Sequence, residues 1–200
     1  MIMHGRNNNP RGLHEQHFTA HIGLYPSFSA FVAFYEHAIE KLYSEVSERN
    51  ETADAVAIPL LFLMRHTMEL GYKFSLVHLC ELNSSIFTPE LKGHEGHSLT
   101  KLHARLGSEF SKALANGRIS ARDREAFEEH YSTTEKGMKL FDALDERSAK
   151  LRFPNSDQTA AFPLDATVNL LELKEAFDEA MVLLGTIVDV IARPEVYYGG

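Results

Sequence analysis

Hydrophobic residues recur every three or four positions over most of this chain, a spacing that predicts amphipathic helices. We expect five helices, over about residues 26–49, 53–82, 98–115, 120–144 and 166–192. Pro59 falls within the second, where we expect it to kink the helix or to mark its true beginning. No stretch has the pattern of a strand of more than a few residues. The sequence therefore predicts an all-α bundle of four to five helices.

The pattern indicates a single domain. Two hundred residues are ample for one hydrophobic core, and no internal repeat, low-complexity tract or linker divides the chain. Residues 1–24 are polar and rich in histidine, and we expect them to be loosely ordered or draped over the surface. Residues 25–194 are expected to form the helical domain.

Composition limits the classes of function. The formal net charge of −8 argues against a broad nucleic-acid-binding surface, although a local basic cluster is compatible with it. Cys80 is the only cysteine, so no intrachain disulfide can form, and we expect it in the core. The N-terminus has no apolar run typical of a signal peptide, and the apolar run 56–64 is too short for a bilayer. We expect a soluble cytoplasmic protein without a membrane segment.

Four ionisable residues interrupt the most apolar predicted helix. Arg65, His66, Glu69 and Lys73 are three or four positions apart and therefore project within one sector. One interpretation is a solvated face with ion pairs. The other is a cleft between helices, because the flanking residues are strongly apolar and a buried charge needs a partner.

Two further groups of polar residues are candidates for chemistry. His94 and His97 precede the third predicted helix, but a zinc site needs three or four ligands, so we expect no metal and place His97 at the helix start. Arg152 stands between apolar Leu151 and Phe153. It can pair with a carboxylate such as Glu69 or Asp145, or it can pin its loop to the bundle.

Three short motifs resemble bacterial HEPN-like proteins. They are Leu63-Met64-Arg65-His66-Thr67-Met68-Glu69-Leu70-Gly71-Tyr72-Lys73, then Gly96-His97-Ser98-Leu99, then Asp145 followed by Leu151-Arg152-Phe153-Pro154. In that family the corresponding motifs read Arg-His-x-x-Glu-Leu-x-x-Lys, Gly-His-Asp-Leu and Asp…Phe-Arg-Tyr-Pro. This chain departs from them with Ser98 for Asp, Leu151 for Phe and Phe153 for Tyr.

The resemblance implies an α-helical protein that forms a homodimer and handles RNA or a nucleotide in a toxin or phage-defence system. Many such proteins are metal-independent ribonucleases that need no cofactor, with four to six residues between a catalytic arginine and a catalytic histidine. Arg124 and His130 have that spacing, although Glu125 replaces the usual small polar residue. In that chemistry His would act as acid or base and Arg would stabilise the phosphorane.

Other members of the family are inactive and bind partner proteins. The alternative is therefore a non-catalytic interaction or assembly module, in which the ionisable residues Arg65, Glu69, Lys73 and Arg152 form a structural network. A metal-dependent hydrolase using His94 and His97 is a third and weaker hypothesis.

Overall fold

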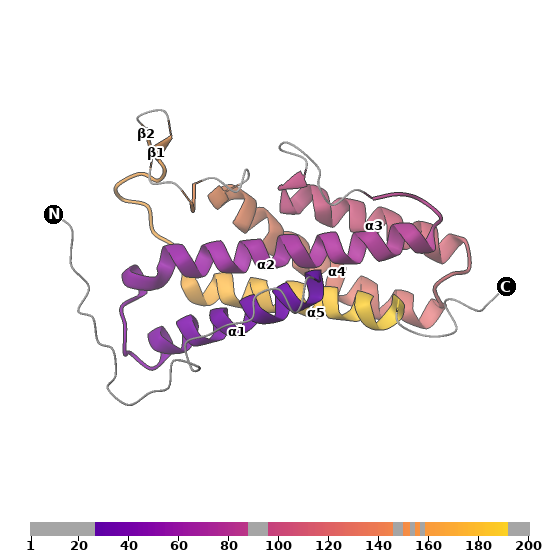
Figure 1. The fold of residues 1–200 in the computed structure, drawn as a ribbon, viewed down its shortest axis with the longest axis horizontal. Coiled ribbons are helices and arrows are strands. Elements are labelled where there is room, and N and C mark those ends of the chain that lie inside the picture. The colour runs from indigo at the N-terminus through magenta and orange to yellow at the C-terminus, as the bar shows by residue number, and fades with distance from the viewer. Residues whose placement is uncertain (1–26, 88–95, 146–149, 153–154, 157–158, 192–200) are drawn as a thin grey trace, which may run out of the picture.

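The computed structural model describes residues 27–87, 96–145, 150–152, 155–156 and 159–191. Most of them belong to five helices: α1 (Phe28–Ser47), α2 (Ala53–Leu82), α3 (Leu99–Ala115), α4 (Ala121–Asp145) and α5 (Leu170–Ile191). Two short antiparallel strands, β1 (Asn155–Ser156) and β2 (Thr159–Ala160), lie between α4 and α5. The prediction of an all-α bundle is confirmed, with five helices among the described residues (Figure 1).

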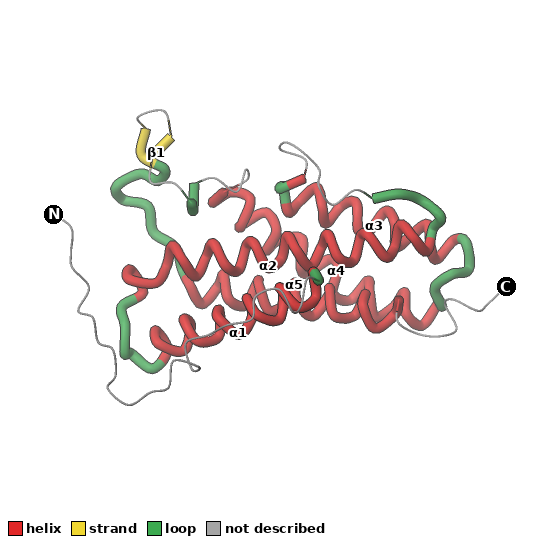
Figure 2. Tube along the Cα trace, in the orientation of Figure 1, coloured by secondary structure: helices red, strands yellow, loops and turns green. Residues whose placement is uncertain are grey.

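Helix α2 is the central element of the bundle. It packs against α1, α3 and α5, while α4 packs against α3 and α5. Figure 1 shows α2 running along the molecule with α1 and α3 on opposite sides, and Figure 2 shows the short turns that join α1 to α2 and α3 to α4. Gly71 permits the close approach of α5, because a Cβ at this position would lie 2.7 Å from Leu184 Cδ1.

Two predicted boundaries differ from the observed ones. Of the two roles expected for Pro59, that of helix start is wrong, because α2 begins at Ala53 and continues through the proline. Helix α5 begins at Leu170 rather than near residue 166. The side chain of Asn169 explains this start, since its Oδ1 accepts hydrogen bonds from the amides of Leu171 and Glu172.

Helix α1 is the least buried helix despite its apolar sequence. Ile39 is its one fully buried residue, whereas Phe31 and Phe34 are 42% and 57% exposed. Its last half is tied to α5 through Lys174, which forms ion pairs of 2.8 Å with Glu40 of α1 and with Asp178. The first half of α1 therefore presents apolar side chains that the described part of the chain leaves partly uncovered.

A buried histidine connects α2, α3 and α4. His103 Nδ1 lies 3.0 Å from the Tyr72 hydroxyl, and the His103 ring stacks on Tyr131 with centroids 4.1 Å apart. The Tyr131 hydroxyl donates to the carbonyl of His103. Burial lowers the pKa of His103 to about 4, so the ring is neutral in the folded protein near pH 7.

This histidine makes stability depend on pH. In the unfolded chain His103 titrates near 6.5, so between pH 6.5 and 4 the unfolded state binds more protons and stability falls as the pH is lowered. The loss attributable to His103 is as much as about 3 kcal/mol. We expect His103→Asn, which keeps a polar atom near the position of Nδ1, to flatten this slope in denaturant unfolding from pH 7 to 4. An unchanged slope would contradict the assignment.

Candidate functional site

Three buried ionisable residues of α2 meet His97, which lies just before α3, and Asp142 of α4. We call Arg65, Glu69, Lys73, His97 and Asp142 the polar cluster. Arg65 is 1% exposed, Glu69 3% and Lys73 7%. Of the two interpretations of this stripe, a solvated face is wrong, because the apolar residues around it place it where α2 is covered by its neighbours.

Glu69 is the central acceptor of the polar cluster. Lys73 Nζ donates to its Oε1 over 2.6 Å, and Arg65 Nη1 donates to its Oε2 over 3.3 Å. His97 Nδ1 also lies 2.9 Å from Oε1. Helical spacing explains the first two contacts, since Arg65 and Lys73 are each four positions from Glu69.

Arg65 extends these contacts to α3 and α4. Its Nη2 donates to the carbonyl of His97, just before α3 begins, and lies 3.7 Å from Asp142 Oδ1 of α4. The planar guanidinium can meet several acceptors at once, which lysine cannot do in the same geometry. One side chain of α2 therefore contacts two other segments of the bundle.

Asp142 of α4 caps the N-terminus of α3. Its carboxylate accepts from the amides of Leu99 and Thr100 over 2.9 and 2.8 Å and from the Ser98 hydroxyl over 2.9 Å. Ser98 Oγ in turn accepts from the amide of Lys101. First-turn amides lack partners within a helix, and a carboxylate there also interacts well with the helix dipole. Asp142 thus fixes α4 to the start of α3.

Charge pairing keeps Glu69 ionised. Burial by itself would raise the pKa of Glu69, but the hydrogen bond and charge of Lys73, together with those of His97, outweigh it and lower the pKa. Arg65 and Lys73 carry two positive charges against the two carboxylates of Glu69 and Asp142. The buried part of the cluster is therefore internally balanced.

His66 lies at the edge of the polar cluster, on the side of α1. Its ring stacks on Phe62 at 5.7 Å and meets Tyr35 edge-on at 5.3 Å. Burial lowers the pKa of His66, and Lys73, Arg152 and Arg65 lower it further against the opposing effect of Glu69. His66 is thus favoured in its neutral form.

Asp145 and Arg152 differ in exposure. Asp145 is 1% exposed and its carboxylate accepts from the amides of Lys150 and Leu151 over 3.0 and 3.1 Å. Leu151 is buried, and Arg152 is exposed with its charge acting on His66. Asp145 therefore holds residues 150–151 against the end of α4 through backbone contacts.

The sequence reasoning missed Asp142, which completes the cluster. Most N-caps come from a residue at the start of the helix itself, and Ser98 is such a residue for α3, so its capping role can be predicted from sequence. Asp142 is more than 40 residues away in sequence from the amides that it caps, so no local sequence pattern indicates this contact. The one available hint is an aspartate in the last turn of a helix, where a negative charge is unfavourable unless it has a partner elsewhere.

Aromatic side chains continue from the polar cluster over α1 and α2. We call Phe31, Phe34, Tyr35, Phe62 and His66 the aromatic face. Phe31 and Tyr35 meet edge-on at 6.2 Å, and Tyr35 contacts His66 as described above. Large exposed aromatic side chains of this kind are typical of surfaces that bind another molecule.

The predicted ribonuclease pair lies on α4, away from the polar cluster. Arg124 Nε donates to Glu128 Oε1 over 2.7 Å, and both side chains are more than half exposed. His130 is half-buried, and its carbonyl accepts from the hydroxyls of Thr133 and Thr134. Among the described residues, no hydrogen bond or ion pair joins the side chains of Arg124 and His130.

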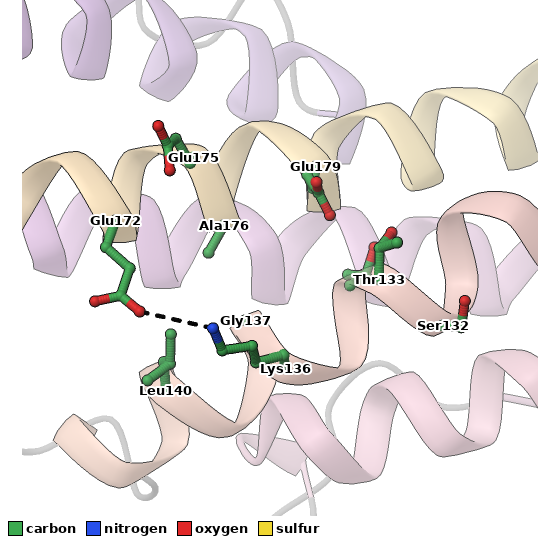
Figure 3. Close-up of a pocket in the computed structure, with 10 residues that line it drawn as sticks. Ser132, Thr133, Lys136, Gly137, Leu140, Glu172, Glu175, Ala176 and Glu179 are labelled. Atoms are coloured by element: carbon green, nitrogen blue, oxygen red, sulfur yellow. Dashed lines mark ion pairs between the residues drawn. The ribbon is translucent and has the colours of Figure 1, made fainter.

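A cavity of about 450 Å³ lies along α4 and α5, starting two residues after His130. Figure 3 shows Glu172, Glu175 and Glu179 of α5 on one side and residues of α4, including Lys136, on the other. Lys136 Nζ is 3.9 Å from Glu172 Oε1, so its charge is partly compensated. Three carboxylates against one ammonium would repel the phosphates of RNA.

Some predictions fall outside the described residues. They are the loosely ordered segment 1–24, the ends of the domain 25–194, and His94 of the weaker metal hypothesis. No cluster of three or more His, Cys, Asp or Glu suited to a metal ion occurs in the described ranges. None of the helices described is long and apolar enough to cross a membrane.

Comparisons with known proteins add no family to this description. No protein family, curated protein or solved structure matches the chain. The fold and the site therefore rest on the residues and contacts described above.

The cap by Asp142 predicts a measurable loss of stability. We expect Asp142→Ala to lower the free energy of unfolding by about 2–4 kcal/mol, because it strands the first amides of α3 and removes a negative charge near buried Arg65. Glu129→Ala, an exposed carboxylate on the same helix, should change it by less than about 0.5 kcal/mol. Urea unfolding of both variants makes the comparison, and equal effects would contradict the role of Asp142.

Proposed function

We propose that this chain is a non-catalytic HEPN-like module that acts by binding other protein chains, beginning with a second copy of itself, in a toxin or phage-defence system. The observation that carries the proposal is the balanced polar cluster. Its cations and carboxylates contact one another, so the charges of Arg65 and Lys73 are compensated by Glu69 and Asp142 and are not available to bind a phosphate. The residues that carry the resemblance, Arg65, Glu69, Lys73 and His97, then serve to hold three helices together.

The aromatic face supports association. Phe31 and Phe34 are partly exposed on a helix with one buried residue, and aromatic side chains dominate the binding energy of many interfaces. A twofold-symmetric dimer would bring two such faces together, which is the commonest arrangement of homo-oligomers. The family resemblance also implies a dimer.

The surroundings of α4 disfavour the ribonuclease alternative. A catalytic arginine must present its positive charge to a phosphate, whereas the exposed ion pair with Glu128 partly neutralises the charge of Arg124. The cavity that follows His130 is lined by more carboxylates than cations. A ribonuclease site in a dimer would have to form beside α4 and α5. The negative charge of the chain would repel RNA there.

Association predicts a concentration-dependent dimer that depends on the aromatic face. We expect light scattering to give twice the chain mass of 22.5 kDa for the wild type and the monomer mass for Phe31→Ser/Phe34→Ser. Val182→Ser, a partly exposed apolar residue on α5, is the matched control and should remain dimeric. A wild type that stays monomeric at all concentrations would contradict the proposal, and a dimeric Phe31→Ser/Phe34→Ser variant would exclude this face.

The absence of catalysis is tested separately. We expect no RNA cleavage by the purified wild type in excess chelator, and no difference between it and His130→Ala. Cleavage that is lost in His130→Ala while the variant stays folded would overturn the proposal in favour of a metal-independent ribonuclease with its site on α4. Cleavage lost in Arg65→Ala alone would place a catalytic site in the polar cluster.

A further inference from the structure

An apolar groove of about 460 Å³ lies between α1, α2 and α5, with α2 as its floor. Val32 of α1, Phe74 of α2, and Met181 and Val188 of α5 contribute apolar surface, and Val188 is 37% exposed. Helices α1 and α5 both pack on α2. The groove therefore presents apolar side chains of three helices along one strip.

The rim of the groove is acidic. Glu36 of α1 and Asp189 of α5 line it. Burial raises the pKa of Glu36, and repulsion from Glu40 and Asp178 raises it further, which outweighs the attraction of Lys174. Lys174 is itself occupied by ion pairs with Glu40 and Asp178. An occupant that brings positive charge or hydrogen-bond donors would fit this rim, whereas a second copy placed symmetrically here would add more carboxylates.

A buried hydroxyl in the floor also lacks a partner. Ser75 is 0% exposed and lines the groove, and its Oγ makes no hydrogen bond with any described residue. Buried hydroxyls are normally satisfied, so an orphaned one beside a groove indicates a missing polar neighbour. The groove thus calls for an apolar segment that also carries polar groups.

The sequence just before α1 has these properties. Phe18, Ile22 and Tyr25 are four and three positions apart, and His17 and His21 have the same spacing beside them. On a helix the first three would share one face, with the histidines on the adjacent face. Residues 1–26 contain two arginines and four histidines against a single glutamate, so this stretch has the opposite formal sign to the chain as a whole.

We propose that residues 14–25 of this chain dock into the groove, with Phe18, Ile22 and Tyr25 on its apolar floor and the histidines toward Glu36 and Asp189. The attachment point favours this occupant, because Ser27 caps α1 and Ser29 already lines the groove. A segment tethered so closely has an effective concentration in the millimolar range.

This inference goes beyond the proposed function and uses a different surface. Ser29, Val32 and Glu36 lie on a different side of α1 from Phe31 and Phe34, since successive helical residues are rotated by about 100°. The docked segment would cover the groove side of α1, at Ser29, Val32 and Glu36, and would leave the aromatic face available for a second copy. Each proposal can therefore fail without the other.

Disulfide trapping in the full-length chain tests the docking. The variant Ile22→Cys/Val188→Cys pairs the segment with the groove, and Ile22→Cys/Leu171→Cys pairs it with an exposed apolar position elsewhere on α5. The native Cys80 is 1% exposed and does not compete. We expect the groove pair to form an intramolecular disulfide at least tenfold faster than the control pair, and Phe18→Ser to remove most of that advantage.

The other outcomes overturn the proposal. Equal rates for the two pairs would mean that the segment does not dwell in the groove, which would then belong to another partner. A disulfide that forms between two chains would assign the groove to a neighbouring copy's segment. An intramolecular disulfide is detected in a chain of monomer mass, whereas the dimer at the aromatic face is detected by light scattering. The two experiments can therefore fail independently.

Discussion

The bundle depends on burying charged side chains on its central helix together with their partners. Removing one member of a buried ion pair commonly costs about 3–5 kcal/mol, far more than an exposed pair contributes. Helix α2 carries Arg65, Glu69 and Lys73 into the interior, and their position is acceptable because His97 and Asp142 approach from other segments. The start of α3 and the end of α4 are therefore constrained by the charges of α2 as well as by apolar packing.

This arrangement explains how one cluster can specify a fold without performing chemistry. Arg65 contacts the His97 carbonyl and Asp142, and Asp142 accepts hydrogen bonds from the first amides of α3. A shift of either helix would leave a buried charge or amide without its partner. A bundle of apolar helices alone could slide in register more easily, so the polar contacts favour one packing.

The sequence predicts the helices better than it predicts their polar contacts. Helix α2 has the predicted ends, because its periodic apolar residues and its break at Asn50–Thr52 are local signals. The predicted start of α5 is too early, because the hydrophobic pattern extends past the cap that Asn169 forms. The four-residue spacing of Arg65, Glu69 and Lys73 also predicts correctly that they lie on one side of α2. Asp142 could not be found this way, because its partners are distant in sequence and its role is set by the packing of α4 against α3.

The same reasoning explains why surfaces were harder to predict than the core. Periodicity indicates that α1 is amphipathic, but it cannot tell that Phe31 and Phe34 stay exposed while Ile39 is buried. That difference arises from where α2 and α5 lie relative to α1. The aromatic face and the groove thus emerge from tertiary packing alone.

A double-mutant cycle on Arg65 and Glu69 tests the central claim most directly. Arg65→Met and Glu69→Met should each lower the free energy of unfolding strongly, because each leaves the buried charges unbalanced. The double variant keeps Lys73 and Asp142, one charge of each sign, and should lose less than the sum of the single variants, with a coupling of more than about 1 kcal/mol. Additive effects, or single variants as stable as the wild type, would contradict the account of a mutually compensating cluster.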